Sequence, residues 1–380
     1  MLKRGLLVAL LWLAPVAADP LRWNLAEIYP DQQHWEQARL KLSQEIPALS
    51  RYQGKLGQSP ARLREALAEY LRVRKELDRL MAYSSMLADE DLRASEPAEL
   101  NQKAQQLAVA LSTTTSYWQP ELLQMGKARV SALINKDPEL TRYRAYFDHI
   151  LELAPYTRSG EVEKVAAQTG NLQSAGHEIR SVFANAELPY PEVKLSDGQT
   201  VRLDASGYGR YRALPNRQDR QTVFRAFWSR YQEFRRTLAS SLLAQLQAHV
   251  FQKELRGYKS CLEASLLPER IPTEVYHQLI RDVHDSLPTL HRYLKLRKKL
   301  MKIETLGYED LYAPIVSGVD LRYTPAQAIE MSVASVAPLG KDYQRVLEQA
   351  FRQGWTDWMP RPGKRSGAYS NGGAFDVHPY

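Results

Sequence analysis

The sequence predicts a mainly α-helical fold with one short β-hairpin. Apolar side chains recur at three- and four-residue spacing through most of the 380 residues, which is the pattern of amphipathic helices. An alternating pattern appears between residues 193 and 203, around an Asp-Gly pair that is typical of a hairpin turn. No internal repeat at a fixed period and no low-complexity tract interrupts this organisation.

Residues 1–18 are expected to form an export signal. Lys3 and Arg4 supply a basic start, an apolar stretch follows, and small residues precede a cleavage point at Asp19. The apolar stretch is too short to span a bilayer, so it is not a stable transmembrane anchor. The expected location is therefore periplasmic or extracellular.

Three helices are predicted in the first part of the chain. The first begins at Ser59-Pro60, a capping residue followed by proline at the first helical position, and keeps helical spacing to Leu87. The second extends from about Ala98 to Tyr117 and breaks at Pro120. The third covers residues 140–153.

The predicted hairpin also marks a change in the chain. Val193 and Leu195 precede the Asp-Gly pair and Val201 and Leu203 follow it, with a loop of two to four residues and an open register. Two prolines stand just before it, so we place a domain boundary near residue 191. The expected division is an N-terminal helical lobe, 19–191, and a second unit, 192–380.

The longest predicted helix runs from Asn216, whose side chain can cap it, to a stop at Gly257. One face carries the apolar residues Val223, Phe227, Trp228, Tyr231, Phe234, Leu238, Leu242 and Leu246. Thr273 is expected to cap the next helix, and Thr324 to Gln327 form a capping box with proline in its first turn.

Composition limits the functional classes. The chain carries a net charge of +8, but acidic and basic residues are interleaved, as on a solvated surface, so nucleic-acid binding is not indicated. Cys261 is the only cysteine, which excludes an intrachain disulfide and favours a buried, inert thiol. Stability must therefore come from burial of apolar residues.

No catalytic or metal-binding residue is predicted in this chain. His277, His284 and His291 recur every seven residues, about 10.5 Å apart along a helix that Pro288 should disturb, which is too far to share one metal. His177 opens a partial H-E-x-x-H motif, but Ser181 occupies the position of the second histidine. We find no G-x-S-x-G nucleophile motif and no dinucleotide-binding fingerprint.

The glycine-rich C-terminal segment is the remaining candidate. Residues 363–373 read Gly-Lys-Arg-Ser-Gly-Ala-Tyr-Ser-Asn-Gly-Gly, a composition that brings backbone close to a partner. Two basic residues and an aromatic wall at Tyr369 suit the capture of an extended peptide by main-chain hydrogen bonds. A plain glycine-rich loop explains the same residues equally well.

These residues also carry a family resemblance. Residues 363–369 and the following His378-Pro379-Tyr380 resemble the segment just before the zinc motif of the oligoendopeptidase F family, in the thimet oligopeptidase clan. Residues 23–29, Trp-Asn-Leu-Ala-Glu-Ile-Tyr, resemble its N-terminal W-D-L-S-x-L-Y signature. Residues 287–299 resemble its central helix, and residues 308–314 resemble its Y-x-D-L-Y-x-P stretch.

The resemblance implies a mainly α, multi-helix, two-lobed clam-type peptidase with zinc in a deep cleft, hydrolysing internal bonds of oligopeptides. In such enzymes H-E-x-x-H and a downstream glutamate hold zinc and activate water. These groups have no counterpart up to Tyr380, so residues 192–380 are expected to be the first part of a catalytic domain without its zinc-binding helices. The substrate path is implied to be lined by Gly367, Ala368, Tyr369, Gly372, Gly373 and His378.

Three hypotheses follow. The first is a truncated, catalytically incompetent N-terminal portion of a zinc-dependent oligoendopeptidase. The second is a non-catalytic helical protein, derived from that family, that binds peptides or acts as a scaffold. The third is that a separate chain supplies the missing C-terminal catalytic half.

Overall fold

The computed structural model describes residues 21–316, 321–371 and 378, so the predicted export signal at 1–18 lies outside the described residues. The first helices are α1 (Gln32–Glu45), α2 (Pro60–Glu90), α3 (Ser95–Thr114), α4 (Trp118–Asn135), α5 (Pro138–Thr141), α6 (Arg144–Glu152), α7 (Gly160–Gln168) and α8 (Gly170–Val182). Strands β1 (Glu192–Lys194) and β2 (Thr200–Arg202) follow. The later helices are α9 (Ala205–Tyr211), α10 (Arg217–Glu233), α11 (Arg235–Arg256), α12 (Cys261–Leu266), α13 (Thr273–Leu300), α14 (Pro325–Ser335) and α15 (Lys341–Arg352).

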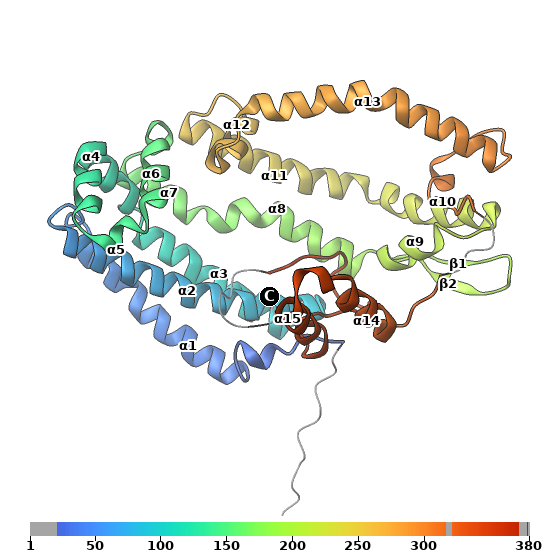
Figure 1. Ribbon diagram of the computed structural model, residues 1–380, viewed down its shortest axis with the longest axis horizontal. Coiled ribbons are helices and arrows are strands. Elements are labelled where there is room, and N and C mark those ends of the chain that lie inside the picture. Colours follow the sequence, from blue (N-terminus) through green and yellow to red (C-terminus); the bar gives the residue numbers. More distant parts are fainter. Residues whose placement is uncertain (1–20, 317–320, 372–377, 379–380) are drawn as a thin grey trace, which may run out of the picture.

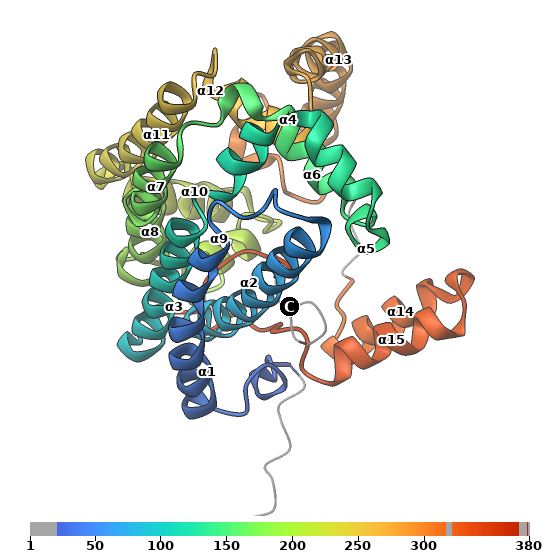
Figure 2. The same cartoon turned by 90° about the vertical axis from the view of Figure 1, so that its left-hand side faces the viewer.

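These elements form an open ring (Figure 1). Helices α1 to α6 make one end, the hairpin with α9 and α10 makes the other, and α8 and α11 run between them side by side. α13 crosses above α11, and the pair α14 and α15 projects to one side of the body (Figure 2). The mainly helical fold with one short hairpin is confirmed.

The larger hydrophobic core lies among the N-terminal helices. It extends from Leu25 to Ile150 and is centred on α2, where Trp35 is fully buried and donates its indole N–H to the Leu80 carbonyl at 3.0 Å. The buried Tyr117 hydroxyl likewise donates to a main-chain carbonyl, that of Leu49, at 2.7 Å. Burial of these rings is favourable because their polar atoms are satisfied.

The start of the first predicted helix is confirmed, whereas two later boundaries are corrected. Ser59 accepts a hydrogen bond from Arg62 N, so it caps α2 as expected. The break predicted at Pro120 lies earlier, at residues 115–117. Pro120 itself lies in the first turn of α4, where a proline is tolerated because its missing N–H would have no helical partner. The helix predicted over 140–153 divides into α5 and α6.

The predicted long helix 216–257 is also two helices. Asn216 caps α10 through Gln218 N and Asp219 N, and Gly257 ends α11 at φ +76°, both as predicted. The chain breaks at Phe234 (φ −98°, ψ 15°), whose ring packs edge-on against Phe183 at 5.1 Å. The break turns α10 onto the hairpin and α11 onto α8. The predicted apolar face is buried at Val223 and Phe227 but exposed at Leu242 and Leu246.

A smaller core surrounds the hairpin. β1 and β2 are antiparallel with Val193 opposite Val201, and Leu195 N donates to Gln199 O, which leaves a tight turn containing Gly198 at φ +86°. Tyr208 stacks on Phe227 at 4.1 Å between this sheet and α10. The hairpin prediction is therefore confirmed, and its register is now defined.

α13 departs from the sequence prediction at two places. Thr273 is its first residue and makes no cap, because Pro272 occupies the capping position. The helix also continues through Pro288, since the loss of one main-chain hydrogen bond does not break a helix of 28 residues.

Cys261 is half-buried at the start of α12, rather than fully buried as expected.

A buried ion cluster joins α10 and α13. The Asp310 side chain is 0% exposed and accepts hydrogen bonds from Arg217 Nη2 at 2.9 Å, Arg220 Nη2 at 2.9 Å and Gly307 N at 3.0 Å. Arg297 of α13 donates to the Asp310 main-chain carbonyl at 2.7 and 2.9 Å. Burial alone would raise the pKa of Asp310, but the hydrogen bonds from Arg217, Gly307 and Arg220 lower it to about 2.

A second set of long-range contacts links the C-terminal segment, residues 354–371, which we call the strap, to the N-terminal helices. Leu92 N donates to Gly363 O at 2.8 Å, and Arg365 N donates to Asp89 O at 3.0 Å. Gly363 has φ +81°, and a Cβ there would overlap the Asp91 carboxylate. Glycine is therefore required at this point of the strap by both backbone conformation and space.

The Asp310 cluster predicts a large stability effect. Asp310→Asn is expected to lower the free energy of unfolding by roughly 3–5 kcal/mol, because Arg220 stays buried without its counter-charge. Since the folded-state pKa of Asp310 is depressed, its stabilising effect is complete above about pH 4 and declines as the pH falls towards 2. Urea denaturation of both proteins at neutral pH and at about pH 3 measures this.

The matched control is Asp342→Asn, because Asp342 is fully exposed and lies 3.9 Å from Arg345. We expect a change within about 0.5 kcal/mol for this variant. Equal unfolding free energies for the two variants would contradict the assigned role of Asp310.

The strap gives a second prediction. Gly363→Ala is expected to detach the strap, so that trypsin cuts after Lys364 or Arg365 several-fold faster than in the unaltered protein. Gly367→Ala is the control, because Gly367 also has a positive φ (+104°) but has no atom within 4 Å of a Cβ. Equal cleavage rates in the two variants would show that the contact with Asp91 does not hold the strap.

Candidate functional site

Tyr369 is the predicted site residue with the most defined surroundings. Its hydroxyl donates to Asp89 Oδ2 at 2.7 Å, and its ring lies 6.0 Å from that of Trp23. Burial of the hydroxyl and the nearby Asp89 carboxylate raise the pKa of Tyr369 above its usual value, so it remains a donor. The residue as a whole is 48% exposed.

The other predicted residues have fewer described contacts. Gly367 and Ala368 are exposed, and nothing packs against Gly367. His378 stacks on Trp355 with ring centroids 3.5 Å apart. Gly372 and Gly373 lie outside the described residues. The close backbone approach expected of the glycine-rich segment occurs at Gly363, and its partner is the end of α2.

Charged groups around the strap form a fixed network. Asp357 accepts hydrogen bonds from Arg361 Nη1 and Lys364 Nζ, both at 2.8 Å. Burial would raise the pKa of Asp357, but these two cations lower it. Burial raises the pKa of Glu90, whose carboxylate lies 3.7 Å from Arg361. Each charge has a neighbour of opposite sign, so the network fastens the strap.

The histidines do not come together. His277, His284 and His291 are exposed along α13, and His177 is exposed on α8. Among residues 21–316, 321–371 and 378, no group of three His, Cys, Asp or Glu side chains could hold a metal ion. A zinc site needs at least three protein ligands. The described residues therefore do not fit the zinc that the sequence resemblance implies.

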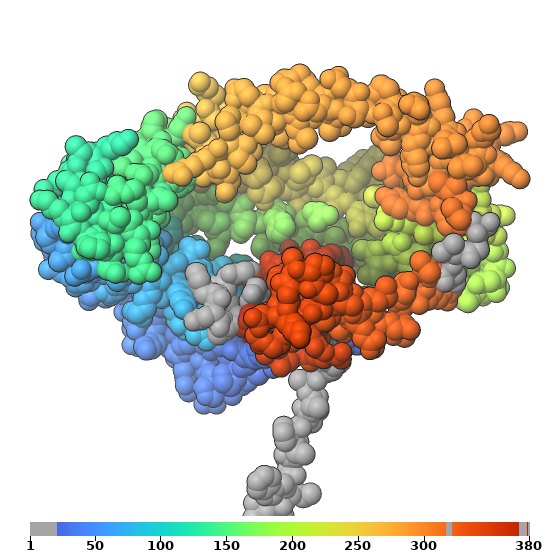
Figure 3. Space-filling view, in the orientation of Figure 1, coloured from blue at the N-terminus to red at the C-terminus, as the bar shows by residue number. Residues whose placement is uncertain are grey.

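The middle of the molecule is open, with α13 crossing above a hollow (Figure 3). Helices α11 and α13 carry exposed large apolar side chains, between 47% and 60% accessible: Leu242, Leu243, Leu246, Val250, Val275, Leu279, Val283, Leu290 and Leu296. Exposed apolar surface of this extent is typical of an interaction surface. Within the part of the chain described, no helix has the length and apolarity to cross a membrane.

Sequence reasoning did not identify the partners of the strap. Asp89, Glu90 and Asp91 form an acidic run at the end of α2, and Arg361 and Arg365 lie far along the chain. Their opposite charges were the one feature of the sequence that could have indicated this pairing. Charge alone could not pair them, because many acidic and basic runs occur in this sequence.

Two family models match this chain. The family model described as Peptidase family M3 matches residues 210–376, and that described as Oligopeptidase F matches residues 121–190. Oligopeptidase PepF of Bacillus subtilis is 31% identical over 94% of this chain and 53% of its own length. Group B oligopeptidase PepB of Streptococcus agalactiae is 30% identical over 95% of this chain and 60% of its own.

Solved structures of related proteins give the same family assignment. The crystal structure of oligoendopeptidase-F from Enterococcus faecium has a TM-score of 0.74 and 29% identity, covering 84% of this chain and 60% of the other. The chain thus spans between half and two thirds of the length of these relatives. Its helical fold and both family matches confirm the resemblance seen in the sequence: this chain belongs to the oligoendopeptidase F family.

Proposed function

We propose that this chain forms the substrate-enclosing part of an exported, zinc-dependent oligoendopeptidase and does not hydrolyse peptides by itself. The observation that carries the proposal is an open ring in which the described residues bring no three His, Cys, Asp or Glu side chains together to hold zinc. The relatives are named as oligopeptidases, which supports a peptide as the substrate. Zinc, when bound by the complete enzyme, would polarise the scissile carbonyl and activate water.

The apolar faces of α11 and α13 support the proposal that further polypeptide completes the enzyme. Opposite sides of α11 differ: Ser241 packs closely on Gly176 of α8, whereas Leu242 and Leu246 are exposed. α13 is exposed along nearly its whole length. Leaving such faces in water is unfavourable. The part of the relatives that this chain does not span is the natural cover, as a continuation or as a separate chain.

The competing hypothesis is a non-catalytic scaffold or peptide-binding protein that functions without any further polypeptide. It would keep the same ring but would need no cover over α11 and α13. The exposed apolar residues of these helices therefore argue against it, because a protein that functions as it stands rarely exposes so long an apolar face.

Direct assays test the proposed function. The purified 380-residue chain is expected to bind no stoichiometric zinc and to show no chelator-sensitive cleavage of a quenched fluorescent oligopeptide, because three suitable ligands do not come together in the described residues. Metal analysis and the fluorescence assay measure the two quantities. Oligopeptidase PepF of Bacillus subtilis, assayed in parallel, is the positive control for cleavage.

A result of about one zinc per chain, with cleavage that a chelator abolishes, would contradict the proposal. It would place a complete catalytic site within this chain.

A further inference from the structure

The guanidinium of Arg212, directly after α9, lies against two aromatic rings. Its central carbon is 3.6 Å from the ring centroid of Tyr312 and 5.6 Å from that of Tyr208, which stands one turn earlier in the chain. Arg212 is half-buried, and its side chain makes no hydrogen bond or ion pair with the described part of the chain. A ring face attracts the cation, but the five N–H donors stay available to a ligand.

The buried Asp310 holds the tyrosines of this region in place. Tyr308 and Tyr312 flank Asp310 in the sequence, and the Asp310 carboxylate is fastened to α10 by Arg217 and Arg220. The Tyr308 ring lies 6.2 Å from that of Phe224 on the same helix. Both tyrosines are therefore positioned before any ligand arrives, which lowers the entropic cost of binding.

Trp228 of α10 extends the aromatic surface. Its indole N–H donates to the Tyr208 hydroxyl at 3.1 Å, and its ring lies 6.3 Å from that of Phe224. Large parts of three rings remain accessible: Trp228 is 45% exposed, Tyr312 46% and Tyr308 64%. Exposed tryptophan, tyrosine and arginine together are typical of binding hot spots. We call Arg212, Trp228, Tyr308 and Tyr312 the Arg212 surface.

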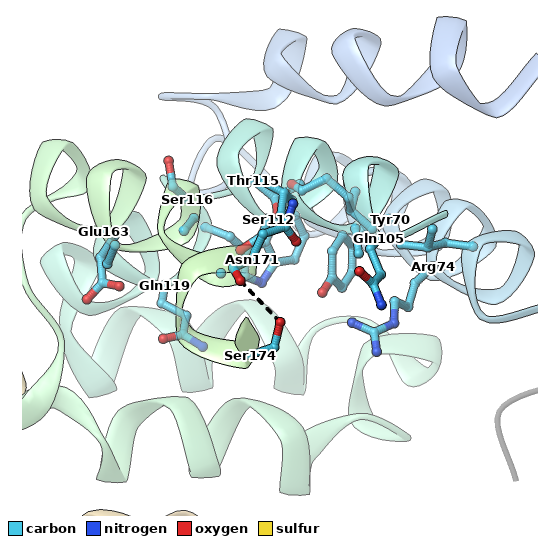
Figure 4. A pocket seen from close by; sticks show the side chains of 18 of the residues that line it. Tyr70, Arg74, Gln105, Ser112, Thr115, Ser116, Gln119, Glu163, Asn171 and Ser174 are labelled. Atoms are coloured by element: carbon cyan, nitrogen blue, oxygen red, sulfur yellow. Dashed lines mark hydrogen bonds between the residues drawn. The ribbon is translucent and has the colours of Figure 1, made fainter. Parts of the chain in front are cut away.

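The large cavity among the N-terminal helices offers no comparable cation. Its volume is about 640 Å³, and polar side chains of α2, α3 and α8 surround it (Figure 4). The two arginines that line it already bind carboxylates. Arg256 donates to Glu163 at 3.0 and 3.1 Å, and Arg74 donates to Asp78 at 2.9 Å.

A single available guanidinium favours a carboxylate as its ligand. Two parallel N–H groups of an arginine match the two oxygens of a carboxylate. The neighbouring Arg217 and Arg220 supply no second charge, because both already bind Asp310. A phosphate group carries almost two charges and is recognised mainly by clusters of arginines. The Arg212 surface therefore fits one negative charge beside aromatic rings.

We infer that the Arg212 surface binds a carboxylate of a peptide, with the Arg212 guanidinium donating to its oxygens and adjacent peptide atoms packing on Tyr312 and Trp228. The peptide as ligand rests on the proposed function, whereas the preference for a carboxylate follows from Arg212 itself. A C-terminal carboxylate and an acidic side chain share this chemistry. The site requires no metal ion, so the purified chain should already possess it.

Calorimetric titration of the 380-residue chain with three acetylated tetrapeptides tests the inference. The first, Ala-Ala-Phe-Ala, has a free C-terminal carboxylate. The second, Ala-Glu-Phe-Ala, is amidated and carries only the acidic side chain, and the third, Ala-Ala-Phe-Ala amide, is uncharged. At least one of the charged peptides is expected to bind about three- to tenfold more tightly than the uncharged one, and the preferred peptide identifies the source of the carboxylate. Equal affinity for all three peptides, or no binding, overturns the inference.

Two variants locate the site. Arg212→Gln removes the charge and is expected to abolish the preference for the carboxylate. Tyr312→Leu removes the ring beneath the guanidinium and is expected to weaken binding of the preferred peptide about threefold. Arg210→Gln is the matched control, because Arg210 is an exposed cation two residues away that lies over a different ring, that of Tyr211.

Circular dichroism shows whether each variant is folded. An unchanged preference in Arg212→Gln, or an equal loss in Arg210→Gln, would contradict the assignment to Arg212. None of these results bears on zinc content or cleavage, so the proposed function stands or fails separately.

Discussion

The buried carboxylate of Asp310 is the constraint on which the open half of the ring depends. A charge without access to water is stable only when it is paired, and here two arginines of α10 surround it. Arg297 holds the adjacent main chain from α13. α13 has otherwise little contact with the described structure. The Asp310 cluster at one end and the turn at α12 at the other therefore set the direction of α13 across the hollow.

The strap closes the other side of the ring. Gly354 O accepts a hydrogen bond from Asn24 N at 2.7 Å, and Gly363 reaches the end of α2, so segments far apart in sequence meet here. Gly363, in the glycine-rich motif, thus joins the strap to the N-terminal helices.

Local chemistry was readable from the sequence, and contacts between distant residues were not. The Ser59 cap, the Gly257 stop and the Asp-Gly hairpin depend on neighbouring residues and were predicted correctly. The break at Phe234 depends on packing against Phe183, which no periodicity reveals. At the site, the glycine motif identified the family, but its partners on α2 became visible only in three dimensions.

Helices α11 and α13 present exposed apolar faces, and we propose that another part of a peptidase covers them. Hydrogen–deuterium exchange of the purified chain tests this most directly, because helix amides without packed neighbours open readily. We expect α13 to exchange much faster than α2, whose apolar side is buried in the larger core. Protection of α13 equal to that of α2 would contradict the claim.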